Sequence, residues 1–138
     1  MNSLYHYPTN MTFFSTSEKL EINDIPFIST KPKPGKQEAL EYYRRIATSN
    51  HLNIHLFEKV KKVDSSEEGI HKITTSKRNY TSKNVIIATG FYDIPNYLNI
   101  PGEDLPKVAH YYGDPHYYAA QKTIVVGASN SAVDAALE

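Results

Sequence analysis

The chain has 138 residues, a length that fits one ordinary domain with a hydrophobic core. Its 15 lysines and arginines balance 15 aspartates and glutamates, so charge favours neither a nucleic-acid nor a membrane-surface partner. The absence of cysteine excludes disulfides, thiolate metal ligands and thiol redox chemistry by these side chains. No apolar run reaches transmembrane length and no signal-peptide pattern opens the chain, so we expect a soluble, cytoplasmic protein.

Residues 1–35 show no clean periodicity, and only the stretch 12–22 is a candidate for a short helix or turn. From residue 36 apolar residues recur at helical spacing, a Pro-Gly pair precedes them and Asn50 follows. The pattern predicts an irregular segment followed by a helix over about 36–49.

The next part of the chain has the pattern of short strands. Apolar residues alternate over 52–58, and turn clusters then separate the segments 58–66, 69–76 and 79–90. We expect an antiparallel meander that leads into an apolar strand at 85–88, buried on both faces. A connector rich in proline and turn residues follows over 91–121, and a second buried strand is expected at 123–127.

The sequence "GASNSA" over 127–132 favours a nucleotide-binding turn at the start of an alanine-rich helix. Gly127 allows a tight turn, and the amides of residues 128–130 would point along the helix N-terminus, where the dipole favours a phosphate. The usual fingerprint is G-x-G-x-x-G/A, and here Ser129 replaces its second glycine. An ordinary strand-to-helix turn, capped by Ser129 or Asn130, stays open as the alternative.

A second glycine-containing motif ends the expected strand at 85–88. Ala88, Thr89 and Gly90 place a hydroxyl and a flexible backbone where a ligand could approach. By itself the motif is more typical of a strand end before a turn than of a ligand site. The order of elements is more specific: meander, "ATG" strand, connector, and then a second glycine turn.

That order resembles the two-dinucleotide-binding-domain flavoproteins, which include thioredoxin reductases and flavin-containing monooxygenases. The stretch "YPTNMTFFSTSEKLEINDIPF", together with "IIATGFYD" and "NSAVDAALE", is similar to the bacillithiol disulfide reductase (YpdA) group, and the likeness extends along nearly the whole chain. It implies an incomplete α/β, Rossmann-like fold with three layers in the order ββα and with a β-meander. Residues 1–90 would be part of an FAD-binding domain, 91–121 the connector, and 122–138 the start of an NADPH-binding domain.

The resemblance also implies which residues contact the cofactors. The flavin ring and ribityl chain would meet Tyr7, Pro8, Thr9, Thr12, Phe13, Phe14, Ser15 and Ser17, although Phe13 and Phe14 could equally be core residues. The backbone of Val60 would flank the adenine, and Ala88, Thr89 and Gly90 would contact FAD. The NADPH pyrophosphate would lie against Gly127, Ala128, Ser129, Asn130, Ser131 and Ala132.

A full-length relative would use NADPH to reduce FAD by hydride transfer and then reduce a low-molecular-weight thiol disulfide. Thioredoxin reductases carry Cys-x-x-Cys just before the second glycine turn, and residues 111–122 contain none, which excludes a dithiol relay there. The first FAD fingerprint, with its cysteine, would precede Met1. We therefore expect an internal piece of a longer flavoprotein, inactive alone and binding FAD weakly. Three questions stay open: which disulfide the full-length protein reduces, whether it uses NADPH or NADH, and whether it forms a homo-oligomer.

Two other functions remain as alternatives: a flavin monooxygenase-like oxygenase, and a non-enzymatic domain in which both glycine motifs are plain turns. His110 and His116 lack a third metal ligand at a suitable spacing, so we interpret them as surface or interface residues. We interpret Asp93, Glu103 and Asp104 as turn and cap residues rather than acid/base groups.

Overall fold

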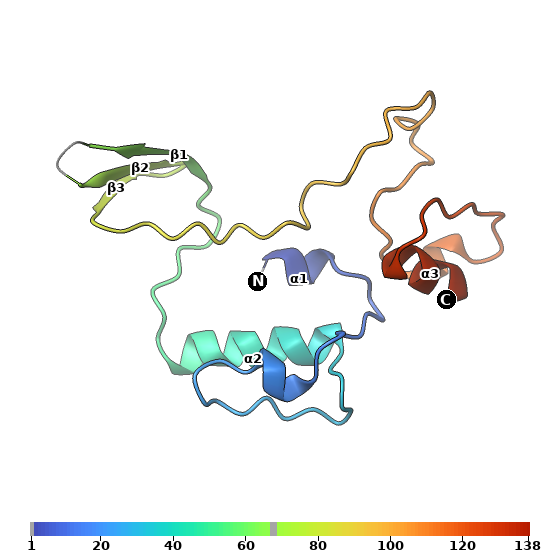
Figure 1. Cartoon of the computed structure of the whole chain (residues 1–138), viewed down its shortest axis with the longest axis horizontal. Helices are drawn as coiled ribbons and strands as arrows, with labels where there is room; N and C mark the ends of the chain where they lie inside the picture. The colour runs from blue at the N-terminus through green and yellow to red at the C-terminus, as the bar shows by residue number, and fades with distance from the viewer. Residues whose placement is uncertain (1, 67–68) are drawn as a thin grey trace. The chain divides into compact units, whose positions relative to one another are not determined.

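The computed structural model describes residues 2–66 and 69–138, which form two compact units. One unit combines residues 1–50 with 91–138, and the other comprises 51–90. In Figure 1 the cyan helix α2 belongs to the first unit and the green three-stranded sheet to the second.

Helix α2, Lys36–Ser49, carries the hydrophobic core of the first unit. Ala39, Tyr42 and Ile46 lie on one helix face at helical spacing and are buried, because this spacing aligns successive side chains. The helix ends at Asn50, whose backbone N–H and side-chain amide both donate to the Ile46 carbonyl. The predicted helix over 36–49 is confirmed.

A polar side chain connects the core to the loop that covers it. The ring of Tyr42 stacks on Phe27 with 4.3 Å between ring centroids, and both residues are buried. The Tyr42 hydroxyl accepts a hydrogen bond from the Ile22 N–H at 2.9 Å and donates to the Ile25 carbonyl at 2.6 Å. One side chain therefore fills the core and satisfies two backbone groups of an irregular segment.

A carboxylate organises the segment before α2. The Glu38 oxygens accept hydrogen bonds from the Gly35 N–H at 2.9 Å, the Thr30 N–H at 3.1 Å and the Ser29 hydroxyl at 3.0 Å. These bonds, the one from Gly35 foremost, lower the pKa of Glu38. The side chain thus begins the helix and closes the preceding turn.

Two short helices lie in the N-terminal 35 residues. The 3-10 helix η1, Ser17–Leu20, falls within the stretch where a short helix or turn was predicted. Helix α1, Asn2–His6, was not predicted, and it has no buried residue. The ammonium group of Lys36 donates to the Tyr5 and Tyr7 carbonyls at 3.0 and 2.6 Å. This tertiary contact satisfies carbonyls at the end of α1, and no local sequence pattern reveals it.

The second unit contains the predicted antiparallel meander, which is confirmed. Strands β1 (Val60–Ser65), β2 (His71–Thr75) and β3 (Asn79–Ser82) pair in the order β1-β2-β3, with both neighbours antiparallel. The register of β1 against β2 shifts between Val60 and Lys62, the signature of a β-bulge.

The other three strand predictions are wrong for the described residues. The stretches 52–58, 85–88 and 123–127 have no strand pairing, and Ile86 and Ile124 are 90% and 92% exposed. The apolar pattern favours burial in a sheet, but a strand forms only when a neighbouring backbone accepts and donates its hydrogen bonds. No segment among residues 2–66 and 69–138 does so for these stretches.

The C-terminal part of the first unit is irregular over much of its length. The 3-10 helix η2, Pro115–Tyr118, begins after Asp114, whose carboxylate accepts the His116 N–H at 2.9 Å. Helix α3, Asn130–Leu137, is the expected alanine-rich helix. None of the described helices is long and apolar enough to cross a membrane.

Removing the Tyr42 hydroxyl tests the coupling between core and loop. Tyr42→Phe should lower the free energy of unfolding by about 1–3 kcal/mol, because the Ile22 N–H and Ile25 carbonyl lose a partly buried partner. Urea unfolding followed by far-UV circular dichroism measures the change. Tyr5→Phe is the control, since the exposed Tyr5 hydroxyl makes no hydrogen bond within the described residues, and equal effects of the two variants would contradict the interpretation.

Candidate nucleotide-binding site

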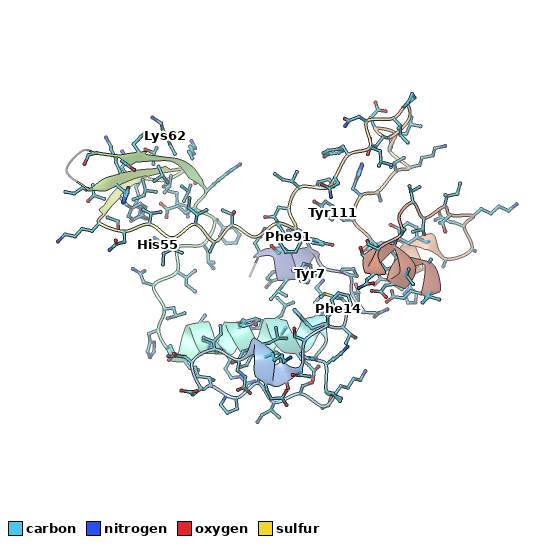
Figure 2. The ribbon with its side chains drawn as sticks, in the orientation of Figure 1. Tyr7, Phe14, His55, Lys62, Phe91 and Tyr111 are labelled. Carbon is cyan, nitrogen blue, oxygen red and sulfur yellow. The ribbon has the colours of Figure 1, made fainter. Side chains whose placement is uncertain are left out.

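The first predicted flavin contacts belong to a row of aromatic rings in the first unit. Tyr7 meets Phe13 and Tyr92 edge-on, with ring centroids 6.4 and 4.6 Å apart, and the ring centroids of Tyr92 and Tyr111 lie 5.1 Å apart. Tyr7 and Tyr111 are labelled in Figure 2. The Tyr111 hydroxyl donates to the Tyr92 carbonyl at 2.8 Å. Partial burial raises the pKa of both Tyr92 and Tyr111. The sequence offered only the aromatic pairs "FY" and "YY" as a signal for these two residues.

The remaining residues of the predicted flavin segment have different environments. The Thr9 N–H donates to the Gly113 carbonyl at 2.9 Å, and Thr12 forms an isolated antiparallel bridge with Gly35. Phe14 is 67% exposed, whereas Phe13 packs against the core cluster of α2. Pro8 and Ser15 are half-buried, and Ser17 is buried at the start of η1. Thr9, Thr12 and Phe14 are thus the exposed predicted contacts of this segment, and Tyr7 is half-buried.

Val60 lies at the open edge of the meander in the second unit. The Ser76 N–H donates to the Lys59 carbonyl at 2.8 Å, and Val60 stands opposite Thr75. In an antiparallel pair the residue next to such a bond turns its own N–H and C=O away from the partner strand. Because β1 is the outer strand of this sheet, these groups face the unpaired edge. One donor and one acceptor side by side can hydrogen-bond the edge of an adenine.

The "ATG" motif of the second unit is exposed. Ala88, Thr89 and Gly90 all lie outside strands, and Gly90 has a φ of +75°, in the left-handed region that glycine adopts without strain. The structure therefore leaves this backbone accessible, in contrast to the strand end predicted from the sequence.

The glycine turn before α3 is closely packed. Gly127 has a φ of +147°, and a Cβ atom placed on it would lie 3.0 Å from the Ala132 Cβ. Ser129 occupies the N-cap position of α3, yet its side chain makes no capping hydrogen bond. The first turn of α3 therefore leaves backbone N–H groups without a side-chain acceptor, in the arrangement that binds a phosphate. Of the two caps expected for an ordinary strand-to-helix turn, the one from the Ser129 side chain is therefore not formed.

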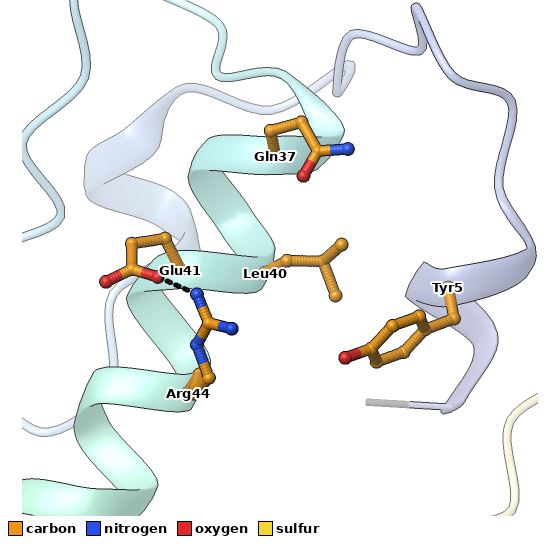
Figure 3. Close-up of a pocket in the computed structure, with 5 residues that line it drawn as sticks. All are labelled: Tyr5, Gln37, Leu40, Glu41 and Arg44. Carbon is orange, nitrogen blue, oxygen red and sulfur yellow. Dashed lines mark hydrogen bonds and ion pairs between the residues drawn. The ribbon is translucent and has the colours of Figure 1, made fainter.

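Two hollows of the described surface bear on the predicted contacts. One, of about 360 Å³, lies between α1 and α2 and has Glu41 and Arg44 paired at its rim (Figure 3). It is lined by Tyr5, Gln37, Leu40, Glu41 and Arg44, none of which is a predicted cofactor contact. The other, of about 300 Å³, lies beside the meander and is lined by His55, Glu58, Val60, Ile73, Thr75 and Tyr80. Only the second includes a predicted contact, Val60.

The histidines and carboxylates of the connector form local pairs. Glu103 accepts hydrogen bonds from the Leu98 and Asn99 N–H groups at 2.9 and 2.6 Å and pairs with His110 at 3.0 Å. The His110 hydrogen bond foremost lowers the pKa of Glu103. His116 pairs with Asp114 at 3.0 Å. No cluster of three or more metal-ligating side chains occurs among the residues described. Glu103 therefore acts as a turn residue.

Comparison with known proteins places this geometry in a family. A family model described as pyridine nucleotide-disulphide oxidoreductase matches residues 1–138. The bacilliredoxin reductase Bdr of Bacillus subtilis is 50% identical over all 138 residues, which make up 43% of that protein.

Solved structures of bacillithiol disulfide reductase Bdr (YpdA) match as well. The Staphylococcus aureus protein is 44% identical with a TM-score of 0.94, and the Bacillus cereus protein is 45% identical with a TM-score of 0.93. Each match covers 99% of this chain, and 42% and 44% of the respective relatives. These matches confirm the predicted α/β flavoprotein fold class and the predicted relationship. The chain belongs to the pyridine nucleotide-disulphide oxidoreductase family.

Proposed function

We propose that this chain supplies FAD- and NADPH-binding surfaces to a flavoprotein that reduces bacillithiol disulfide, a low-molecular-weight thiol disulfide. The observation that carries the proposal is the 50% identity to a bacilliredoxin reductase along the whole chain. The chain spans 43% of that relative, so the activity is proposed for the protein that includes these residues. A cytoplasmic location and a small-molecule substrate are parts of the same proposal.

The turn at Gly127 supports NADPH binding. The missing side-chain cap of α3 leaves N–H donors for the pyrophosphate, and the close approach of Gly127 to Ala132 keeps the turn narrow. Residues 127–132 would hold the pyrophosphate, with Ser129 small enough to let it approach. The donor set thus fits the group.

Two separate surfaces support FAD binding. The open N–H and C=O of Val60 would hold the adenine, and the accessible residues of the segment 7–17 would cover the flavin. Exposed Thr89 and Gly90 would contact the same cofactor. When bound, FAD would accept a hydride from NADPH and supply the electron pair that, with two protons, converts a disulfide into two thiols. Because the chain has no cysteine, no thiol of these residues takes part.

A segment exchange tests the proposed function. The matched 138 residues of the Bacillus subtilis reductase are replaced by this chain, and the unmodified reductase is the control. The exchanged protein should retain bound flavin and reduce bacillithiol disulfide with NADPH within about tenfold of the control rate. A folded, flavin-loaded protein that does not reduce bacillithiol disulfide would contradict the proposal. If that protein instead consumes oxygen when it oxidises NADPH, the monooxygenase alternative would be favoured.

Gly127→Ala in the exchanged protein tests the NADPH turn. The added methyl group would meet the Ala132 Cβ at 3.0 Å and force an unfavourable φ, so the KM for NADPH should rise about tenfold or more. Flavin content should not change, since the predicted FAD contacts lie elsewhere. Gly113→Ala is the matched control because a Cβ at that position meets no atom within 4 Å. Equal KM values for the two variants would show that the turn does not bind the nucleotide.

A further inference from the structure

Glu58 is an almost fully buried carboxylate two residues before Val60. Its side chain is 3% exposed, and one oxygen accepts hydrogen bonds from the Thr75 hydroxyl at 2.7 Å and the Tyr80 hydroxyl at 2.9 Å. His55 Nδ1 lies 3.4 Å from its other oxygen, and Arg78 Nε lies 3.7 Å from the first. His55 comes from the loop before β1, Thr75 from β2 and Tyr80 from β3. Arg78 comes from the β2–β3 turn, so contacts of the carboxylate connect four segments of the unit.

Burial of a carboxylate is costly, and a buried charge stabilises a fold no better than well-packed apolar side chains. The hydrogen bond from Thr75 foremost lowers the pKa of Glu58, which keeps the group ionised as a pure acceptor. Such a carboxylate fixes the positions of the groups that hydrogen-bond to it. Here it fixes the backbone at the start of β1.

The backbone at the start of β1 needs such a constraint. Phe57 has a φ of +55°, an uncommon conformation for a non-glycine residue, and its side chain is 93% exposed, so its own packing does not hold it. The register then shifts between Val60 and Lys62. Without a fixed anchor, a strand edge beside a bulge can slip, and a slip of one residue would turn the Val60 N–H and C=O toward β2.

Two further hydrogen bonds extend the anchor. The Lys59 N–H donates to the Ser76 hydroxyl at 3.0 Å, and the Ser76 N–H donates to the Lys59 carbonyl at 2.8 Å. Glu58 and Lys59 together therefore hold the strand start against the β2–β3 turn, and Val60 follows with its polar groups on the open edge.

We propose that Glu58 is a positioning residue that fixes the Val60 backbone as an adenine-docking edge and so selects FAD over flavin nucleotides without adenine. This inference rests on the proposed function, because it takes FAD as the ligand. Glu58 does not touch the adenine; Thr75, Tyr80 and Glu58 act through the strand that they hold.

Nuclear magnetic resonance on the ¹⁵N-labelled 138-residue chain tests the inference. The chain is titrated separately with FAD, ADP and FMN, of which only FMN lacks adenine. The Val60 amide should shift with FAD and with ADP and should not shift with FMN. Glu58→Ala should weaken binding of FAD and ADP about tenfold and leave FMN unaffected. Thr75→Val should produce a smaller loss of the same kind, because it removes one of two hydroxyl donors to the carboxylate.

Asp64→Asn is the matched control. Asp64 lies on β1, the strand that Val60 begins, and its side chain is 46% exposed. Among the described residues its carboxylate pairs only with Lys62, at 2.8 Å. The rate of hydrogen exchange at the Ser76 amide, which donates to the Lys59 carbonyl, can be measured without ligand. This rate should increase in Glu58→Ala and stay unchanged in Asp64→Asn. A loss of FAD and FMN affinity together would indicate general destabilisation and overturn the positioning role.

The outcomes separate the inference from the proposed function. FAD could shift the amide resonances of the segment 7–17 and leave the Val60 amide unchanged, with equal FAD affinity in Glu58→Ala and the unmodified chain. In that case the inference fails, and flavin binding stands. If none of the three nucleotides shifts any amide, the adenine edge is refuted in this chain. The segment exchange then decides independently whether the reductase function survives.

Discussion

The second unit depends on the carboxylate of Glu58, which takes hydrogen bonds from Thr75 and Tyr80 while its side chain is 3% exposed. The same device recurs in the first unit. Glu38 accepts hydrogen bonds from the loop before α2, and Glu103 accepts two backbone N–H groups of the connector. In each case an acidic side chain satisfies groups that regular secondary structure leaves unpaired. These hydrogen bonds fix the backbone conformation of irregular segments that bury few apolar side chains.

Elements that satisfy their own hydrogen bonds were predictable from the sequence. Helix α2 closes its bonds internally, and the meander strands pair across short turns, so local patterns suffice for both. The apolar stretches 85–88 and 123–127 differ, because a buried strand depends on neighbours distant in sequence. Ile86 and Ile124 are almost fully exposed and unpaired among the described residues. The apolar pattern of these stretches indicates a preference for burial, but it does not indicate which strand would pair with them.

The candidate site was predictable where backbone geometry follows from residue type. A Cβ atom on Gly127 would lie 3.0 Å from the Ala132 Cβ, and both positions of this close approach are readable from "GASNSA". The aromatic residues Tyr92 and Tyr111 lie 85 and 104 residues after Tyr7 in sequence, and no local pattern connects them to it. Glu58 was missed for a similar reason, since its hydroxyl partners come from two later strands. Side-chain networks across strands carry no periodic signal.

A structure of the segment-exchanged reductase with bound FAD and NADP⁺ would locate both nucleotides. We expect the adenine of FAD to hydrogen-bond the Val60 N–H and C=O. We also expect the pyrophosphate of NADP⁺ to lie against the first turn of α3 beside Gly127. An adenine held by other residues, or a pyrophosphate remote from Gly127, would refute the proposed binding surfaces.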